Sequence, residues 1–560
     1  MVSRRAENIL QFLIGLMVVV IANQLISKYP LRFDLTEEKR YSISDASKQL
    51  LKSLDDVAYV EVYLDGELPS GFKRLKKSIQ ETLDDFQFYA GQNIEYKFID
   101  PSQAAGQQAK NEFYRSIANK GIQPTNLAFT KDGNKTEKLI FPGAVVSYYG
   151  KEKAVMLLKG NQAASSEERL NQSIEGLEYE LSSAIRTLAS DQKKKVGIVV
   201  GHGESDSLDI AGVRNALLEK YEVFTVDLPR REKSLDNYDA LIIAKPTEAF
   251  SEKEKYKLDQ FIMKGGKALF FLDAMHVDMD SAVNGGGTIA IPHELNLTDL
   301  LFKYGVRVNQ NYVQDIVCGN FPVVAGNMGD QPQLRMLPWP FYPVVNKFGD
   351  HSIVKNMDAV AMKFASNMDT VKAVGIKKTP LLYTSQYSRV LSFPVQVALN
   401  DLQNNLDPDR FNQGEQAVAY LLEGVFTSLF KNRNLPDGVD KSDFRETGVK
   451  TGILVCSDGD LIRNDFSLKT GDPLELGADP FSQTKYANQD FVLNALEYLL
   501  NDNGIITAKA KEIKLRPLDK VKIAEEKTKW QIINLALPLV LLLIYGVVRA
   551  YLRKRKYARF

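Results

Sequence analysis

With 560 residues, the chain is long enough for two or three folded domains. Its 44% hydrophobic and 25% charged residues are typical of an ordinary folded protein. A net charge of +1, with acidic and basic residues interspersed, argues against a nucleic acid partner, because neutralising phosphates requires a basic excess or stripe. Cys318 and Cys456 lie outside any CxxC, which excludes a structural zinc site or a dithiol redox centre and leaves one disulfide or two free thiols as alternatives.

Two long uncharged apolar runs lie towards the ends of the sequence. The first extends over 8–27 and the second over 530–548. As helices with a rise of 1.5 Å per residue, both would be roughly 28 to 30 Å long, which matches the hydrocarbon thickness of a bilayer. We therefore expect two transmembrane helices around one large body.

Each run has an alternative interpretation. Arg4 and Arg5 before the first run are typical of a cleaved signal peptide, but the run is too long for one and no small-residue cleavage site follows it. The second run could be a buried core helix, which its position before the basic tail 549–560 argues against. Pro538 within it indicates a packing partner in the membrane. The numbers of positive charges on the two sides of the apolar runs are nearly equal, so they barely favour one orientation. The dense basic tail favours cytoplasmic termini.

The first soluble segment is predicted to contain a parallel βαβ unit. An alternating stretch at 57–64 indicates a strand, a helix follows at 73–89, and a second strand lies at 94–101. Such a unit closes as a parallel pair with a right-handed crossover. The arrangement is similar to a thioredoxin-like fold without its cysteines, so no thiol chemistry follows. Two more strands and a helix at 165–190 complete the segment.

The second segment is predicted to form a doubly wound α/β sheet, because strands alternate with helices along it. The expected strands lie at 196–200, 221–226, 240–244, 267–272 and 451–456, and the expected helices at 208–219, 251–264 and 488–500. Residues 309–450, which are rich in Pro and Gly, are interpreted as an insertion or third subdomain.

Ligands of open α/β sheets bind at the carboxyl ends of the strands. The candidate ligand crevice there consists of six residues: His202, Glu204, Lys245, Asp273, His276 and Asp458. Imidazole and carboxylate groups that could in principle bind a metal belong to His202, Glu204, Asp273, His276 and Asp278. Their spacing matches no metalloenzyme pattern, so solvated turn residues or caps are the expected alternative. No metal and no cofactor is predicted.

Catalytic motifs are missing from the places where this fold would carry them. A nucleophile on a strand-to-helix elbow needs a tight Gly-flanked turn, and the turn at Lys245 reads AKPTEAF, with neither the glycine nor a Cys or Ser. No GxxxxGK[ST] occurs, and NGGGT at 284–288 lacks the lysine and the preceding strand of a phosphate loop. The sequence therefore predicts no catalytic residue and no ATPase.

Several short motifs carry a family resemblance through their order: DLTEEKRYSISDASKQLLKSL, VYLDGELPSGFKRLKKSIQETLDDF, FIDP, IVVGHGE, HSIVKNMDAVAMKFASNMD, TPLLYTSQYSR, VCSDGDLIRND and KEIKLRPLD. Together they resemble the GldG family of gliding-motility-associated ABC transporter auxiliary components. The resemblance implies a middle domain related to glutamine amidotransferases that lacks their catalytic Cys and His. It also implies a substrate-binding or auxiliary role beside a permease subunit and a cytoplasmic ATPase subunit, in gliding motility and adhesin secretion.

The expected organisation comprises a transmembrane helix at 8–27, a thioredoxin-like α/β domain at 28–190, an amidotransferase-like domain at 191–308 and 451–505 around the insertion 309–450, a membrane-proximal linker at 506–529, a transmembrane helix at 530–548 and a basic cytoplasmic tail at 549–560. We expect a bacterial inner-membrane protein whose body is periplasmic and binds a ligand or a protein. Two alternatives remain open. One is a membrane-anchored envelope hydrolase that uses His202, Glu204, Asp273 and His276. The other is a scaffold that uses 337–345 (LPWPFYPVV) as a contact surface.

Overall fold

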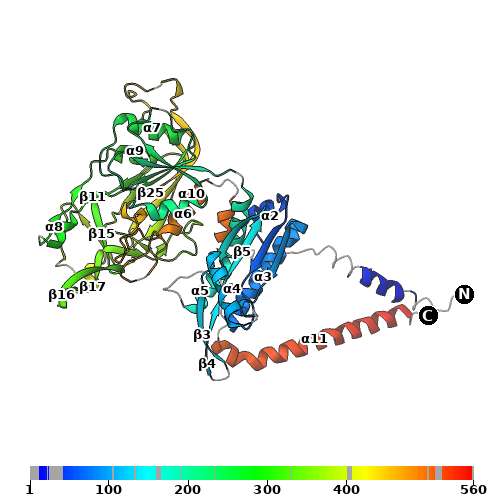
Figure 1. Cartoon of the computed structure of the whole chain (residues 1–560). Helices are drawn as coiled ribbons and strands as arrows, with labels where there is room; N and C mark the ends of the chain where they lie inside the picture. Colours follow the sequence, from blue (N-terminus) through cyan, green and yellow to red (C-terminus); the bar gives the residue numbers. More distant parts are fainter. Residues whose placement is uncertain are drawn as a thin grey trace. The chain divides into compact units, whose positions relative to one another are not determined.

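The chain forms two compact units, Met1–Lys511 and Glu512–Phe560. Its structure, a computed structural model (Figure 1), describes residues 10, 12–21, 23, 42–103, 106–131, 134–158, 165–190, 192–232, 234–284, 286–328, 331–399, 406–439, 441–482, 484–500, 504–510 and 520–557.

The amino-terminal part of the first unit is a four-stranded sheet with the order β2-β1-β5-β6. In chain order its elements are α2 (Asp45–Lys52), β1 (Ala58–Val62), α3 (Ser70–Ala90), β2 (Ile94–Phe98), α4 (Gln107–Asn119), the hairpin β3 (Thr125–Lys131) and β4 (Asn134–Ile140), β5 (Gly143–Tyr148), β6 (Lys151–Met156) and α5 (Ser166–Ala189). β1 and β2 pair in parallel, which confirms the predicted βαβ unit. β5 is antiparallel to both β1 and β6.

The helices of this part form where their sequence patterns predict. Four apolar residues of α3 make one fully buried stripe: Leu75, Ile79, Leu83 and Phe86. α5 begins with a capping box, in which the side chains of Ser165 and Glu168 each accept the other residue's backbone N–H. Local sequence thus sets both the position and the inward face of these helices.

The rest of the first unit surrounds an eight-stranded sheet with the order β18-β21-β24-β25-β10-β9-β7-β8. Five of its strands are parallel neighbours: β7 (Lys195–Val200), β8 (Glu222–Asp227), β9 (Ala240–Ala244), β10 (Lys267–Phe271) and β25 (Thr447–Cys456). The helices between and after them are α6 (Ala211–Leu218), α7 (Glu252–Met263), α9 (Thr298–Tyr304) and α10 (Asn488–Leu500). Numbered along the chain, the parallel strands follow the spatial order 2-1-3-4-5 of a doubly wound sheet.

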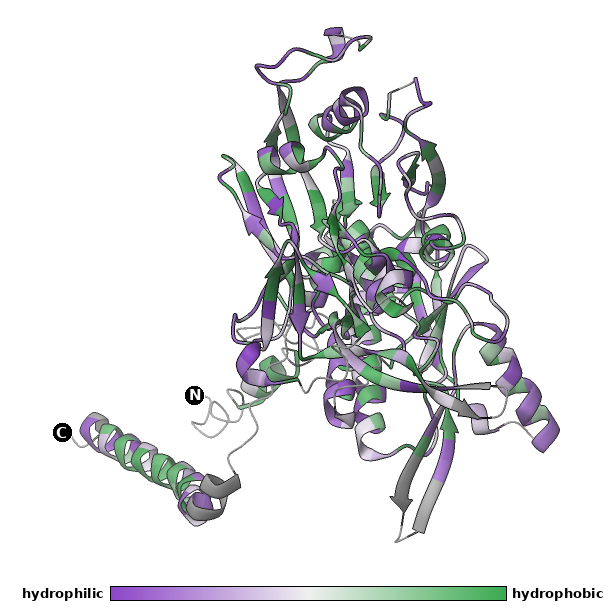
Figure 2. Cartoon of the chain, turned by 90° about the vertical axis from the view of Figure 1, so that its left-hand side faces the viewer, coloured by the Kyte–Doolittle hydropathy of each residue, from purple (hydrophilic) through white to green (hydrophobic). Residues whose placement is uncertain are grey.

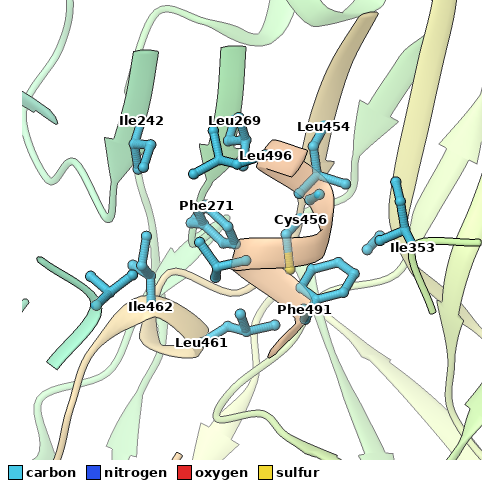
Figure 3. Close-up of a cluster of buried hydrophobic side chains, with 14 of the residues drawn as sticks. Ile242, Leu269, Phe271, Ile353, Leu454, Cys456, Leu461, Ile462, Phe491 and Leu496 are labelled. Carbon is cyan, nitrogen blue, oxygen red and sulfur yellow. The ribbon is translucent and has the colours of Figure 1, made fainter. Parts of the chain in front are cut away.

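Helices cover both faces of this sheet, so its central strands are buried on both sides. Ile242, Leu269 and Leu454 point to the face covered by α6 and α10, where Phe491 and Leu496 of α10 pack on them (Figure 3). The alternate residues of the same strands pack on α7 and α9. This explains the continuous apolar runs in the parallel strands, since strands that face solvent would alternate with polar residues.

The segment 309–450 contributes directly to the large sheet. β18 (Lys347–Phe348), β21 (Ile376–Tyr383) and β24 (Ala417–Thr427) extend it as antiparallel strands beside β25. Three strands of the segment interpreted as an insertion, from Lys347 to Thr427, are therefore part of the main sheet. The smaller elements here are β11 (Met275–His276), α8 (Met279–Asn284), β12 (Thr288–Ile289), β13 (Ile291–Pro292), β14 (Val306–Val308), β15 (Asn311–Asp315), β16 (Cys318–Met328), β17 (Gln331–Val345), β19 (Val360–Ala361), β20 (Met368–Thr370), β22 (Ser388–Ser392) and β23 (Gln396–Val397).

The aromatic stretch 337–345 belongs to β17 and helps to form a small core. Trp339 and Phe341 are fully buried, and both rings contact Phe364. These rings are unavailable as an exposed contact surface, which removes the sequence argument for the scaffold alternative. Cys318 and Cys456 are both free, so the disulfide alternative is wrong.

The second unit contains α11 (Lys520–Tyr557), a helix of 38 residues. Within the described residues it is the one helix long and apolar enough to cross a membrane, over Glu526–Arg555. Hydrophobic residues, green in Figure 2, recur along it. Of the first apolar run, Phe12–Ile21 forms a shorter apolar helix, and most of the remaining run lies outside the described residues. Residues 520–529, expected in a linker, are the start of α11.

Candidate functional site

Three of the six predicted crevice residues meet at the carboxyl edge of the large sheet. Lys245 follows β9 directly, while Asp273 and Asp458 stand just beyond β10 and β25. Since these three strands are neighbours, their ends converge. The Nζ atom of Lys245 lies 3.2 Å from Oδ2 of Asp273. Carboxylate oxygens of Asp273, Asp458 and Asp460 all lie within 4.8 Å of one another.

Lys245 forms a second and shorter ion pair, with Asp460, at 2.6 Å. Burial acts to lower the pKa of Lys245, but the charges of Asp273 and Asp460 outweigh it and raise that pKa. Burial also acts to raise the pKa of Asp460, and Lys245 reverses this and holds it below the usual value. Arg463 contacts the other oxygen of Asp460 at 3.0 Å. Lys245 and Asp460 therefore form an internal ion pair at neutral pH.

Asp458 is fully buried and lies behind this ion pair. Its oxygens accept the backbone N–H groups of Lys363, at 2.8 Å, and of Asp460, at 2.7 Å. Burial raises the pKa of Asp458 well above the usual range, and the charges of Asp460 and Asp273 add to the effect. Burial also raises the pKa of Asp273. The cluster thus combines one ionised carboxylate with carboxyls that retain protons more strongly.

Three carboxylates at this spacing offer enough oxygens for a divalent cation. In this cluster, however, the Lys245 ammonium contacts Asp273 and Asp460 and supplies the positive charge. The carboxylate oxygens therefore bind the ammonium of Lys245, and we assign no metal to this cluster.

The backbone at Lys245 has the geometry of an elbow. Its φ of 55° lies in the left-handed region that favours glycine, directly after a buried parallel strand. Gly459 packs closely against the side chain, since a Cβ atom at position 459 would lie 2.7 Å from Cγ of Lys245. A nucleophile would stand at this position in an elbow enzyme. In this chain it is a lysine held by carboxylates.

His202 and Glu204 belong to a separate cluster in the loop after β7. Nδ1 of His202 lies 3.1 Å from Glu204, and Nε2 lies 3.2 Å from Glu254 at the start of α7. The imidazole stacks on Phe250 with 3.7 Å between ring centroids. Among the described residues, His202 shares no hydrogen bond or ion pair with Asp273. Both of its ring nitrogens face carboxylates, so this histidine stabilises the loop after β7 against the start of α7.

We predict that His202→Gln destabilises the protein in a pH-dependent way. Burial acts to lower the pKa of His202, but hydrogen bonds to Glu204 and Glu254 raise it overall. A raised histidine pKa stabilises the fold fully below the unfolded value of about 6.5, and this stabilisation is lost as pH rises through the folded value. The expected loss is about 2 kcal/mol at pH 6 and clearly less at pH 9. Urea unfolding of the full chain in mild detergent at both pH values would measure it.

The matched control is His276→Gln, because His276 is exposed. This control should change stability by less than about 0.5 kcal/mol at either pH. An equal loss for His202→Gln at both pH values would contradict the assigned charge state.

The remaining predicted residues lie elsewhere. His276 belongs to β11, and its ring centroid lies 5.6 Å from that of His293. Asp278 accepts the N–H of Asp280 and the hydroxyl of Ser281 at the start of α8. The five-residue metal set considered from the sequence is therefore not assembled, because its members belong to separate networks.

Hydrogen bonds bridge the two loops at the usual ligand position of a doubly wound sheet. That position is the switch point between β7 and β9, where the order of the strands reverses. The backbone N–H groups of Thr247 and Glu248 donate to the carbonyl of His202 at 2.9 and 2.8 Å, and Thr247 Oγ1 donates to the carbonyl of Gly203. Direct hydrogen bonds thus join the two loops at the switch point.

The candidate crevice predicted from the sequence leaves out three participants of these networks: Asp460, Arg463 and Glu254. Asp460 stands two residues after Asp458, at the same strand end that the sequence indicates. Arg463 and Glu254 had no local signal, since each acts on a residue that is distant in the sequence.

Together these features describe a mixed α/β protein with one candidate membrane helix. Its elbow position holds a lysine whose positive charge is balanced by carboxylates. The chain belongs to the family described as "ABC-type uncharacterized transport system", whose model, for the auxiliary component, matches residues 193–495, more than half of the chain. Residues 37–147 match a domain of unknown function, DUF7088.

Two individual proteins are also similar to the chain. An uncharacterized protein of Borreliella burgdorferi is 22% identical over 578 residues, which cover 99% of this chain and 99% of that protein. The solved structure of the mmIFT52 N-terminal domain is 12% identical, with a TM-score of 0.31, and covers 55% of this chain and 97% of that one. A TM-score this low carries no argument about the fold.

Proposed function

We propose that the chain is a non-catalytic, substrate-binding-like membrane subunit of an ABC transporter of the GldG type, with a role in gliding motility and adhesin secretion. Membership of the ABC-type transport system family supports the transporter setting. The ordered motifs quoted above support the GldG type. We expect a permease subunit and a cytoplasmic ATPase subunit as its partners.

The observation that carries the non-catalytic role is the ion pair at Lys245. The position where an amidotransferase-like elbow would present a nucleophile holds a lysine, whose ammonium lies 2.6 Å from Asp460 and 3.2 Å from Asp273. A lysine acts as a nucleophile only when deprotonated, and the neighbouring carboxylates raise its pKa. This arrangement favours a rigid internal support over chemistry.

The same proposal covers domains and location. The order β2-β1-β5-β6, with α3 between the parallel strands, supports a thioredoxin-like amino-terminal domain. The 2-1-3-4-5 order supports an amidotransferase-like middle domain. α11 is compatible with one span, and the run 8–27 would provide the second. We place the protein in a bacterial inner membrane with both termini cytoplasmic and the body periplasmic.

Affinity purification of the tagged full chain from native membranes in mild detergent tests this function. Mass spectrometry and an ATPase assay of the eluate should detect a permease and an ATPase in fixed ratio. A chain ending at residue 511, which lacks α11, should lose both partners and serves as the comparison. A full chain that purifies alone, without ATPase activity, would contradict the proposal.

A further inference from the structure

A cavity of about 290 Å³ lies at the carboxyl end of β7, on the side of β8. Its walls are the loop after β7, the beginning of α6 and the neighbouring strand β8, which contributes Thr225. Ile198, Val200 and Ile210 form an apolar part of the wall. Its volume lies at the small end of ligand pockets, so it suits a molecule smaller than a typical drug.

A buried hydroxyl group lacks a partner in the wall of this cavity. Ser205 is 9% exposed, and its Oγ atom is buried without a hydrogen-bond partner among the described residues. Its backbone N–H donates to the carbonyl of Ala244 at 3.2 Å, which fixes the residue in place. Since a buried hydroxyl without a partner costs free energy, a ligand group that reached this hydroxyl from the cavity would satisfy it.

Two opposite charges line the same cavity. Arg214 donates one guanidinium N–H to Thr225 at 3.2 Å, which leaves most of its five donors unused. Asp206 accepts the backbone N–H groups of Leu208 and Asp209 with Oδ1 alone. Neither side chain forms an ion pair within the described part of the chain. One cation and one anion therefore face a common space, each with hydrogen-bonding capacity left.

The other carboxylate of the wall is already engaged. Glu204 accepts the backbone N–H of His202 at 2.6 Å and lies 3.1 Å from the imidazole of the same residue. One positive side chain, Arg214, and one negative side chain, Asp206, thus remain for a ligand.

We propose that this cavity binds a small zwitterion, namely an α-amino acid with an apolar side chain. Its carboxylate would accept from Arg214 and from the Ser205 hydroxyl, and its ammonium would donate to Oδ2 of Asp206. Its side chain would pack on the apolar part of the wall. The inference names a ligand for the substrate-binding role proposed above, and it rests on that role for its biological setting.

Isothermal titration of the purified full chain in detergent with leucine, leucinamide and 4-methylpentanoate tests the pairing of charges. Leucinamide lacks the carboxylate and 4-methylpentanoate lacks the ammonium, while both keep the side chain. Leucine should bind at least about 10-fold more tightly than either analogue, because each analogue loses a charge-assisted hydrogen bond. Equal binding of either analogue, or no binding of leucine, valine and alanine by the folded chain, would overturn the proposal.

Three variants assign the roles within the cavity. Arg214→Gln and Asp206→Asn should each weaken leucine binding about 10- to 100-fold, and Ser205→Ala about 3- to 10-fold. Asp206→Asn keeps the oxygen that accepts from Leu208 and Asp209, so the loop should still fold. The matched control is Arg230→Gln, whose side chain is 88% exposed and should leave binding unchanged.

The variants also separate this inference from the proposed function. Arg214→Gln should lose leucine binding while a permease and an ATPase still copurify with it. Unchanged leucine affinity in both Arg214→Gln and Asp206→Asn would overturn the site, whatever copurifies. Unchanged affinity in Ser205→Ala would show that an ordered water satisfies the hydroxyl and would remove Ser205 from the site.

Discussion

Replacing Glu497 with Gln is expected to lower the free energy of unfolding by about 3 kcal/mol at pH 7. Glu497 lies on α10, is 1% exposed, and joins the two parts of the first unit. Its carboxylate accepts from Tyr179 and Arg186 of α5, both at 2.7 Å, and from Lys220 after α6 at 3.1 Å. An amide of the same shape would leave both cations without their counter-charge.

The stabilisation by Glu497 should depend on pH. Burial acts to raise its pKa, but Lys220 and Arg186 lower it to about 2. A depressed carboxylate pKa gives stability that is present above the unfolded value of about 4.3 and is lost as pH falls towards the folded value. The difference between the natural chain and Glu497→Gln should therefore shrink between about pH 5 and pH 2. Urea unfolding followed by the fluorescence of buried Trp339 would measure it.

The same variant should loosen the connection between the two parts. Lys193 and Lys194 are exposed between α5 and β7, and trypsin should cleave there faster when α5 separates from α10. Glu219→Gln, an exposed neighbour of Lys220, is the matched control and should cleave at the natural rate. If Glu497→Gln unfolds and cleaves like this control, the buried carboxylate does not join the two parts.

The second large effect is expected for Lys245→Met, which should lower the free energy of unfolding by about 3 to 5 kcal/mol at pH 8. The methionine keeps the length of the stem against Gly459 but removes the charge that Asp273 and Asp460 require. The cost should fall at pH 5, because protonation then neutralises the carboxylates that have lost their counter-charge. Urea unfolding in detergent at the two pH values would measure both effects.

Two further variants make the Lys245 prediction specific. Lys253→Met removes an exposed lysine near the start of α7 and should cost less than about 0.5 kcal/mol. The double variant Lys245→Met with Asp460→Asn should recover part of the stability, since it removes an ionised carboxylate together with its cation. A Lys245→Met chain as stable as the natural one at pH 8 would show that the ion pair does not support the fold.

These two buried carboxylate networks differ in what they connect. Glu497 links helices from two parts of the unit, close to the chain segment 505–510 that precedes α11, where Lys509 lies 4.2 Å above the ring of Tyr179. The Lys245 network links the ends of three strands within one sheet. The first network therefore joins two parts of the unit, and the second joins strand ends within one sheet.

Local sequence by itself determined several of the helices and strands of this protein. The stripe of α3 and the capping box of α5 depend on neighbours a few residues apart, and the buried strands β7, β9 and β10 are visible in the sequence as short continuous apolar runs. The same patterns predicted the parallel βαβ unit and the approach of Lys245, Asp273 and Asp458. These three converge because each follows a strand that lies beside the next.

Tertiary structure alone decided the partners of those residues. The pairing of Lys245 with Asp460, of His202 with Glu254, and of Glu497 with Arg186 joins positions far apart in the sequence, and no local period encodes such a distance. The antiparallel strands β21 and β24 were likewise hidden in a segment rich in Pro and Gly, because their burial depends on β25 beside them. Long-range packing thus fills the predicted crevice with ion pairs between Lys245 and the carboxylates of Asp273 and Asp460. The cavity at β7 is therefore the candidate ligand site.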